Sequence, residues 1–125
     1  MLCIDILNNC IIMYTKDEGQ VVRLFYSYSN KDPVLKHLNI IKPYVCILRL
    51  YVNPPYRCFG HATLALKLLF EHLPDANTFI VTANPDDPEY MTHQELLNFY
   101  GKFGFIPIEE VDEGTKMIFK RNLNY

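Results

Sequence analysis

A nearly uninterrupted run of apolar side chains, Tyr44–Val52, constrains the fold more than any other feature of the sequence. A run of this length bounded by turn residues is typical of a strand that is buried on both faces. Asn53-Pro54-Pro55 stops the strand, because proline cannot donate to a sheet ladder. Beyond the stop, apolar residues recur with the period of an amphipathic helix that ends before Pro74. These residues are Ala62, Ala65, Leu66, Leu69, Phe70 and Leu73.

The residues ahead of this strand predict an antiparallel β-meander. Turn residues at Asn8-Asn9 and at Asp17-Glu18-Gly19 separate three β-rich runs. The runs are Leu2–Leu7, Cys10–Tyr14 and Val21–Tyr26. The next segment, Asn30–Ile41, has Pro33 near its start and predicts a short helix.

The residues after the helix predict a βαβ unit, a second helix and a hairpin. Thr78–Ala83 is β-rich and would run parallel to the central strand across a right-handed crossover. Thr92-x-x-Glu95 is a capping box that opens a helix ending at Gly104. The last strand pair is Phe105–Ile108 and Lys116–Lys120, joined by an acidic loop.

Composition excludes several classes of protein. The 125 residues, half of them hydrophobic, match one domain spanning 1–125. The formal net charge of −2 argues against nucleic-acid binding, which usually requires a basic excess. No stretch approaches the roughly 20 apolar residues of a membrane helix, and the N-terminus lacks the basic segment of a signal peptide. We expect a soluble, cytoplasmic protein with no nucleic-acid or membrane partner.

The histidines and cysteines do not predict a metal site. The four cysteines form no Cys-x-x-Cys pair, and the four histidines show no ligand spacing. Cys58 and His61 make a lone Cys-x-x-His without a second pair nearby. We therefore expect no metal, and free, mostly buried thiols.

The loop between the central strand and its helix is the strongest candidate site. Gly60 at the start of a helix lets backbone amides approach a ligand closely, and the helix dipole favours phosphate oxygens there. Arg57 adds a positive charge. A plain strand-to-helix turn, in which Gly60 only relieves strain, is an equal alternative on these residues alone.

Two segments together resemble one enzyme family. Leu50–Ala62 resembles the acetyl-CoA-binding segment of the GCN5-related N-acetyltransferases, in which a strand ending in Val-x-Pro runs into Arg-x-x-Gly-x-Gly/Ala and a helix. His93–Phe105 is similar to the family's Asn-x-x-Ala-x-x-x-Tyr-x-x-x-Gly-Phe. The resemblance covers about Tyr44 to Lys120, and the two motifs stand in the family's order.

The resemblance implies a fold and an activity. The fold is α+β (mixed α/β): a meander leading into a central strand, a βαβ unit with a splayed parallel strand pair, then a helix and a C-terminal hairpin. The activity is direct transfer of an acetyl group from acetyl-CoA to a primary amine, either of a small molecule or of a protein. A degenerate domain that binds CoA or a protein partner without turnover is the alternative, and an interaction module without CoA is a weaker one.

The resemblance also assigns roles to individual residues. The backbone of Leu50, Tyr51 and Val52 would pair with the pantetheine arm. His93 replaces the family's cofactor-contacting Asn, and Tyr100 would protonate the departing thiolate. Tyr100 also shares a helix face with core residues, so packing is its alternative role. The amides that would hold the pyrophosphate belong to Arg57, Cys58, Phe59, Gly60, His61 and Ala62.

Two departures from the family pattern leave roles open. The strand Tyr44–Val52 has no carboxylate, and Arg49 stands just before the pantetheine-pairing residues, so the general base is unassigned. The family's first strand and two helices are missing from the order predicted here, as in small phage and mobile-element acetyltransferases. In the family, these elements form one wall of the acceptor site. Here that wall is either absent, which suits a protein substrate, or supplied by Ser29–Pro43 or by the second subunit of a homodimer. An amine that arrives already neutral is one alternative to a base. Four residues are expected near the cleft mouth, where they are more typical of solvated surface than of a base: Asp86, Asp87, Glu89 and His93.

Overall fold

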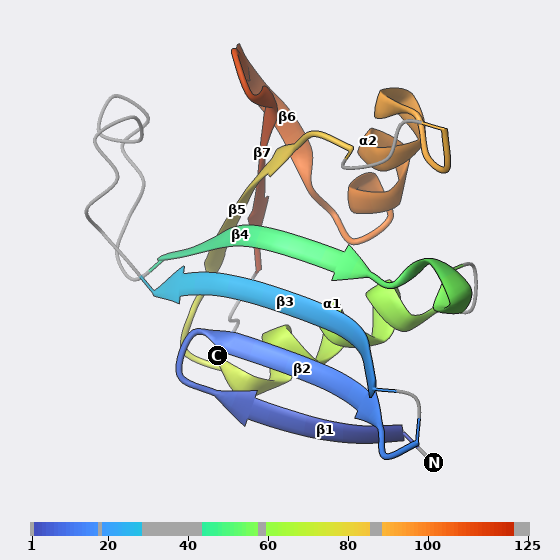
Figure 1. Ribbon diagram of the computed structural model, residues 1–125. Coiled ribbons are helices and arrows are strands. Elements are labelled where there is room, and N and C mark those ends of the chain that lie inside the picture. Colours follow the sequence, from blue (N-terminus) through green and yellow to red (C-terminus); the bar gives the residue numbers. More distant parts are fainter. Residues whose placement is uncertain (1, 18, 29–43, 58–59, 86–88, 122–125) are drawn as a thin grey trace. The chain divides into compact units, whose positions relative to one another are not determined.

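The computed structural model describes residues 2–17, 19–28, 44–57, 60–85 and 89–121 (Figure 1). These fall into two compact units, the first from Met1–Ser27 and Ile47–Pro74 and the second from Tyr28–Cys46 and Asp75–Tyr125. The helix predicted within Asn30–Ile41 lies outside the described residues. The elements are β1 (Leu2–Leu7), β2 (Cys10–Thr15), β3 (Gly19–Tyr28), β4 (Tyr44–Val52), the 3-10 turn η2 (Pro54–Tyr56), α1 (His61–His72), β5 (Thr78–Ala83), α2 (His93–Gly101), β6 (Ile106–Val111) and β7 (Gly114–Lys120).

The first unit begins with the predicted meander. β1 pairs antiparallel with β2 in a register that places Leu7 opposite Cys10, so Asn8 and Asn9 form a two-residue turn. Asn9 has a φ of 68°, a left-handed conformation that asparagine tolerates better than most residues. β2 pairs antiparallel with β3, and Gly19 has a φ of 88° where β3 begins. The turn residues therefore act where the sequence predicts them.

The register separates the two faces of this meander. Residues directly opposite each other in an antiparallel pair lie on the same face. Ile11 pairs with Leu24 and Met13 with Val22, and all four side chains are fully or almost fully buried. α1 contacts β2 and lies behind β2 and β3 in Figure 1. The face that carries these four residues is therefore the face that α1 covers.

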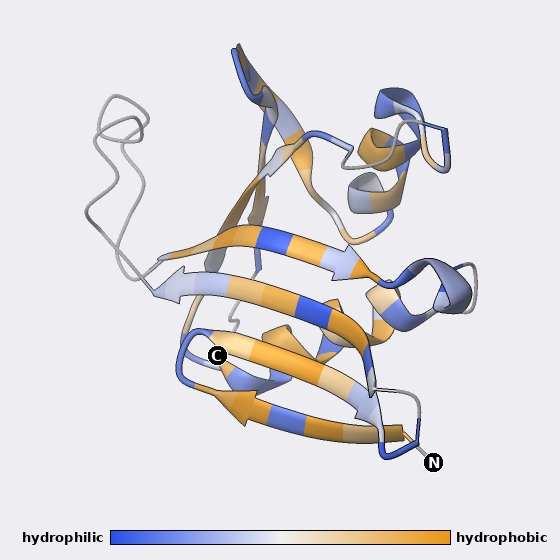
Figure 2. Ribbon diagram, in the orientation of Figure 1, coloured by the Kyte–Doolittle hydropathy of each residue, from blue (hydrophilic) through white to orange (hydrophobic). Residues whose placement is uncertain are grey.

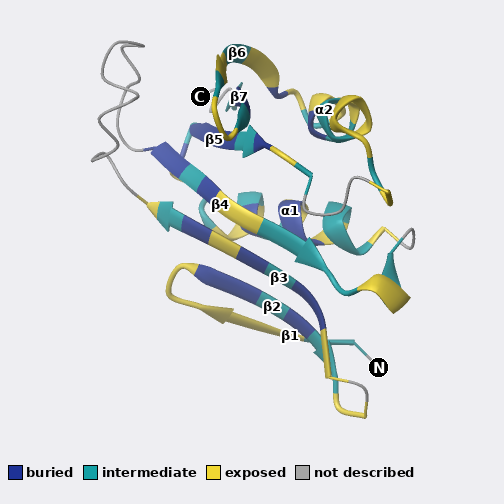
Figure 3. Cartoon of the chain, turned by 45° about the horizontal axis from the view of Figure 1, so that its top comes forward, coloured by how far each residue is buried: buried dark blue, intermediate teal, exposed yellow. Residues whose placement is uncertain are grey.

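The other face of the meander is more open. Ile12 pairs with Arg23 and Cys10 with Phe25, so these residues lie opposite to the face covered by α1. Phe25 is 37% exposed. Figure 3 shows the alternation along β3 as successive buried, intermediate and exposed residues.

β4 has the predicted bounds but not the predicted burial on both faces. Tyr44, Val45 and Ile47 are buried, whereas Leu48 is 65% exposed and Arg49 is also exposed. An apolar side chain tolerates burial, but its presence does not guarantee that another layer covers it. The prediction of two-sided burial is therefore wrong for the second half of the strand.

The second unit contains the helix and the hairpin that follow the crossover. β5 and β6 each pair antiparallel with β7. Tyr44 packs with Ile80 and Ile118 in its core. α2 opens with the predicted capping box, in which the Glu95 amide donates to the Thr92 hydroxyl and the Glu95 carboxylate accepts from the Thr92 amide.

The predicted acidic loop is in fact a tight turn. Val111 pairs with Gly114, so β6 and β7 extend through most of the segment and only Asp112 and Glu113 connect them. Gly114 has a φ of 140°, which only glycine adopts easily. Charged side chains suggested a loop, but exposed hairpin strands also carry them.

The strands form one seven-stranded sheet in the order β1-β2-β3-β4-β5-β7-β6. The order confirms the α+β class, with a meander first and a C-terminal hairpin in which β7 lies between β5 and β6. The parallel, splayed arrangement of β4 and β5 stays a prediction. Among the described residues, no helix is long and apolar enough to cross a membrane.

Gly114 provides a test of the hairpin. A Cβ at this position would clash with the backbone oxygen of Ala83, so Gly114→Ala should lower the free energy of unfolding by about 1–3 kcal/mol. A Cβ added at Gly101, at the end of α2, would meet nothing within 4 Å, so Gly101→Ala should leave stability unchanged or raise it by up to about 1 kcal/mol. Urea unfolding measures both, and equal stability of the two variants would contradict the tight approach.

Candidate functional site

The end of β4 is tied to β3. The Asn53 amide donates to the Val21 carbonyl over 2.9 Å, and the Asn53 side-chain amide donates to the Gln20 carbonyl. The short η2 turn follows, with the Tyr56 amide donating to the Asn53 carbonyl over 2.9 Å. Asn53 therefore fixes the point at which the chain leaves the sheet.

Arg57 fastens the loop to the end of the strand. Its Nε donates to the Val52 carbonyl over 2.9 Å, and its backbone amide donates to the Pro54 carbonyl over 3.3 Å. Leu50, Tyr51 and Val52 are all half-buried. A carbonyl oxygen has two lone pairs, so the Val52 oxygen keeps the capacity for a second donor.

Gly60 is the N-cap of α1 and has a φ of 80°. It makes no side-chain cap, and a Cβ built on it would meet nothing within 4 Å. The first backbone bond of the helix runs from the Leu64 amide to the Gly60 carbonyl, over 3.1 Å. The amides of His61 and Ala62 thus lie ahead of the helical ladder, where the helix dipole is positive. Within the described part of the chain, the space beside Gly60 is therefore open.

The His61 side chain braces the same loop. Its Nδ1 lies 2.9 Å from the Tyr56 carbonyl oxygen, which can only accept, so Nδ1 carries the proton and donates. The rings of His61 and Tyr56 also meet edge to face, with centroids 6.1 Å apart. Cys58 and Phe59, predicted to share in this site, lie outside the described residues.

Three arginine side chains surround the ring of Tyr51. The guanidinium carbons of Arg23 and Arg49 each lie 5.2 Å from the ring centroid, and that of Arg57 lies 5.6 Å from it. These distances are within the range of cation–π attraction. This cluster was not predicted from the sequence, although the Arg49-x-Tyr51 spacing places both side chains on one face of a strand.

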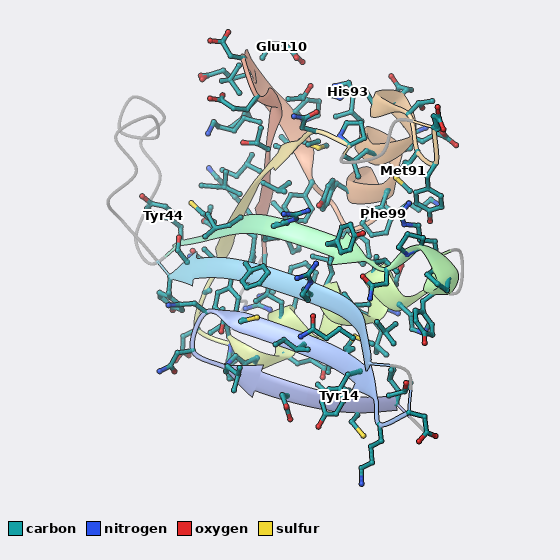
Figure 4. All side chains as sticks on the ribbon, in the orientation of Figure 1. Tyr14, Tyr44, Met91, His93, Phe99 and Glu110 are labelled. Carbon is teal, nitrogen blue, oxygen red and sulfur yellow. The ribbon has the colours of Figure 1, made fainter. Side chains whose placement is uncertain are left out.

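In the second unit, His93 is held by a hydrogen-bonded chain. Its Nε2 lies 2.8 Å from the Thr115 hydroxyl, and that hydroxyl donates to the Glu110 carboxylate over 2.9 and 3.0 Å. Figure 4 shows His93 on α2 and Glu110 on β6. Because a hydroxyl has only one proton, Thr115 must accept from His93, which fixes the proton of the neutral imidazole on Nε2. Nδ1 is then the nitrogen that carries the available lone pair of the neutral ring.

Tyr100 lies in the aromatic core of the second unit. It is 4% exposed, and its ring meets those of Phe99 and Phe105 edge to face, with centroids 5.2 and 5.5 Å apart. This is the packing that the alternative role predicts. A buried phenol can still donate a proton, so its acid role stays a prediction.

The predicted site residues divide between the two units. The first unit holds Leu50, Tyr51, Val52, Arg57, Gly60, His61 and Ala62, and the second holds His93 and Tyr100. Of the alternative bases, Asp86 and Asp87 lie outside the described residues, and Glu89 is exposed. Within the part of the chain that the structure describes, no three His, Cys, Asp or Glu side chains gather as a metal site would require.

The tautomer of His93 is testable. Thr115→Val removes the hydroxyl that accepts from Nε2, so His93 should change from the Nε2-protonated form to a mixture of the two tautomers. Nitrogen-15 NMR of the imidazole measures this change. Thr78→Val is the matched control, since Thr78 is also buried in the sheet but donates to Asn77. An unchanged His93 spectrum in Thr115→Val would contradict the chain.

Comparisons with known proteins add to this geometry. No protein-family model matches the sequence, and no curated protein matches it. Solved structures do match: PH1933 of Pyrococcus horikoshii has a TM-score of 0.70 and 18% identity over 92% of this chain and 66% of its own. PaiA N-acetyltransferase of Thermoplasma acidophilum, in complex with coenzyme A, has a TM-score of 0.63 and 15% identity over 89% of this chain and 59% of its own.

A third structure, Naa20 of Chaetomium thermophilum with a bisubstrate analogue, has a TM-score of 0.66 and 12% identity over 90% of this chain and 65% of its own. This chain thus spans less than two thirds of the length of each of these three proteins. At such identities the similarity shows the fold. The chain has the fold of the GCN5-related N-acetyltransferases.

Proposed function

We propose that this protein is an acetyl-CoA-dependent N-acetyltransferase that moves an acetyl group directly to a primary amine. The observation that carries the proposal is the left-handed Gly60, which begins α1 after the short loop that follows β4 and, among the described residues, leaves the space beside it free. Structural similarity to an N-acetyltransferase in complex with coenzyme A supports it.

The loop of the first unit would bind the cofactor. Backbone amides at the start of α1 suit the pyrophosphate, because they combine unsatisfied donors with the positive end of the helix dipole. Arg57, held at the end of β4 by its Nε, adds positive charge. The backbone of Leu50 to Val52 would orient the pantetheine arm, so that the reacting groups meet in a defined geometry.

The chemistry needs an acid and a neutral amine. Acetyl-CoA supplies a thioester, and attack by the amine nitrogen forms the amide while the carbon–sulfur bond breaks. The Tyr100 hydroxyl would give its proton to the leaving sulfur and recover one from solvent. The amine loses its own proton before or during attack, and no base is assigned to that step.

A binding protein without turnover is the second candidate. β4 carries no carboxylate, and its one charged residue is Arg49. Consumption of acetyl-CoA in the presence of a panel of primary amines, proteins included, distinguishes the candidates. The enzyme forms free CoA thiol only when its acceptor is present, whereas the binding protein forms none.

Gly60→Glu tests the cofactor site. The new carboxylate would occupy the open space and repel phosphate, so acetyl-CoA binding should be lost in isothermal titration while the fold is kept. Gly19→Glu is the matched control, because Gly19 has a φ of 88° and equally open surroundings. It should carry a similar conformational cost and keep acetyl-CoA affinity. Unchanged affinity in Gly60→Glu would remove this loop from the site.

Tyr100→Phe tests the acid. The ring contacts stay while the hydroxyl goes, so turnover should fall by about 100-fold or more, the usual contribution of a general acid, with acetyl-CoA affinity unchanged. Tyr26→Phe removes a hydroxyl from another tyrosine that is 4% exposed and should keep full turnover. Full turnover in Tyr100→Phe would leave Tyr100 as a packing residue only.

A further inference from the structure

β1 is an edge strand of the sheet, and among the described residues no strand pairs with its outer side. Its apolar side chains stay accessible: Ile4 and Ile6 are each 41% exposed, and Leu7 is 53% exposed. Figure 2 shows β1 at the edge as a largely hydrophobic strand interrupted by one hydrophilic band. An exposed apolar edge is a template for pairing with another chain, because its outer amides and carbonyls lack a ladder partner.

The two edges of the sheet differ in the features that prevent such pairing. β6, at the other edge, contains Pro107, a register shift between Pro107 and Glu109, and the further charge of Glu110. β1 has no proline and no lysine, and its six residues pair consecutively with β2. The one charged residue of β1, Asp5, accepts a hydrogen bond from the Tyr14 hydroxyl of β2 and raises the pKa of Tyr14. β1 is therefore the edge that can accept a further strand.

The turn between β1 and β2 decides which backbone groups of β1 are available. Residues that flank a two-residue turn exchange both backbone hydrogen bonds, and Leu7 and Cys10 flank this turn. Bonded pairs alternate along an antiparallel ladder, so Cys3 and Asp5 also bond to β2. The alternate residues, whose amides and carbonyls are directed to the outer edge, are Leu2, Ile4 and Ile6.

These outward-bonding residues also share one face of the strand. Ile4 pairs with Met13 and Ile6 pairs with Ile11, and both partners lie on the face that α1 covers. α1 contacts β2, yet Ile4 and Ile6 of β1 remain exposed. The apolar face therefore continues past α1 to the edge of the sheet, where a second apolar strand would bury it.

A second copy of β1 fits this edge in one register. When Ile4 lies opposite Ile4 of the second copy in an antiparallel pair, Leu2 lies opposite Ile6, so apolar side chains meet on one face and the outward backbone groups of both copies bond to each other. On the other face, Asp5 lies opposite Cys3 and the two Asp5 charges do not oppose each other.

Other registers are worse for identifiable reasons. A shift of one residue would place the outward backbone groups of one copy against groups of the other that already bond to β2. A shift of two residues toward the turn would place Asp5 opposite Asp5, and like charges directly opposite each other destabilise a strand pair. The opposite shift would leave Asp5 and Ile6 without a partner in the second β1.

We propose that β1 is a dimerisation edge, at which two copies of this chain pair antiparallel about a two-fold axis between their Ile4 residues. The meanders of the two copies then form one continuous antiparallel sheet, and assembly stops at the dimer because the two-fold contact is closed. One strand of six residues buries less than a standard protein interface, so we expect micromolar rather than nanomolar affinity. The dimer does not depend on the proposed acetyl transfer.

Sedimentation velocity over a range of protein concentrations tests the dimer. The wild-type protein should pass from monomer to dimer as its concentration rises. Ile4→Lys would place two ammonium groups opposite each other at the axis, so it should weaken dimerisation by about ten-fold or more. Ile106→Lys is the matched control, because Ile106 is 59% exposed on the β6 edge, and it should keep dimerisation. A wild-type protein that stays monomeric at millimolar concentration, or equal dimerisation of the two variants, would overturn the proposal.

Cysteine cross-linking tests the register. In a Cys3→Ser background, Ile4→Cys would place the two new thiols in directly opposed residues, whose Cα atoms are about 5.5 Å apart and within the span of a disulfide. Ile6→Cys is the control, since Ile6 is equally exposed but its two copies would lie roughly 13 Å apart along the strands. Oxidation should give disulfide-linked dimers of the first variant only. Equal cross-linking of both would refute the register.

Amide hydrogen exchange below and above the dimerisation midpoint tests the edge itself. The amides of Leu2, Ile4 and Ile6 should exchange more slowly in the dimer, whereas those of Cys3 and Asp5 should be equally protected in both states. A dimer without this alternation would place the interface elsewhere and overturn the proposal. Slow exchange of the outward amides at every concentration would show that the edge is already covered within one chain, which also contradicts it.

Discussion

The anchoring of the end of β4 is the constraint on which the candidate site depends. Asn53 binds the backbone of β3 through its amide and its side chain, and Arg57 binds the last carbonyl of β4 through Nε. These contacts fix where the chain leaves the sheet and where Gly60 begins α1. Without them, the amides at the start of the helix would have no defined direction. The two prolines restrict the backbone of the loop, but they do not hold the loop against the strands.

Local charge, rather than net charge, characterises the first unit. The whole chain has a formal net charge of −2, yet three guanidinium groups surround one ring and a helix N-terminus follows them. Electrostatic attraction between a protein and its ligand depends on charges within about a Debye length, so an acidic chain can still contain an anion site. The formal net charge of the chain is therefore compatible with a compact anion site.

Most of the fold was predictable because its signals are local. The apolar run gives β4 its bounds, the 3.6-residue period gives α1, and Thr92-x-x-Glu95 gives the start of α2. The exposure of Leu48 and the tight turn before Gly114 were not predictable in this way. The first depends on what covers a strand, and the second depends on how closely Gly114 approaches Ala83.

The candidate site likewise combines features that local sequence signals predict with features that depend on contacts between distant segments. Gly60 and its place ahead of α1 follow from the sequence, as does the aromatic face that includes Tyr100. The arginine cluster needed the β2–β3 register, because Arg23 and Tyr51 are distant in the chain. The His93–Thr115–Glu110 chain likewise needed the pairing of β6 with β7, which places Glu110 opposite Thr115. Contacts between distant segments are the part that sequence patterns do not encode.

Mapping of CoA binding by amide NMR tests the central claim most directly. CoA should shift the backbone amide signals of Gly60, His61 and Ala62 strongly, and those of the Gly19 turn little. Shifts confined to other segments, or no shifts at millimolar CoA, would contradict a cofactor site at the start of α1.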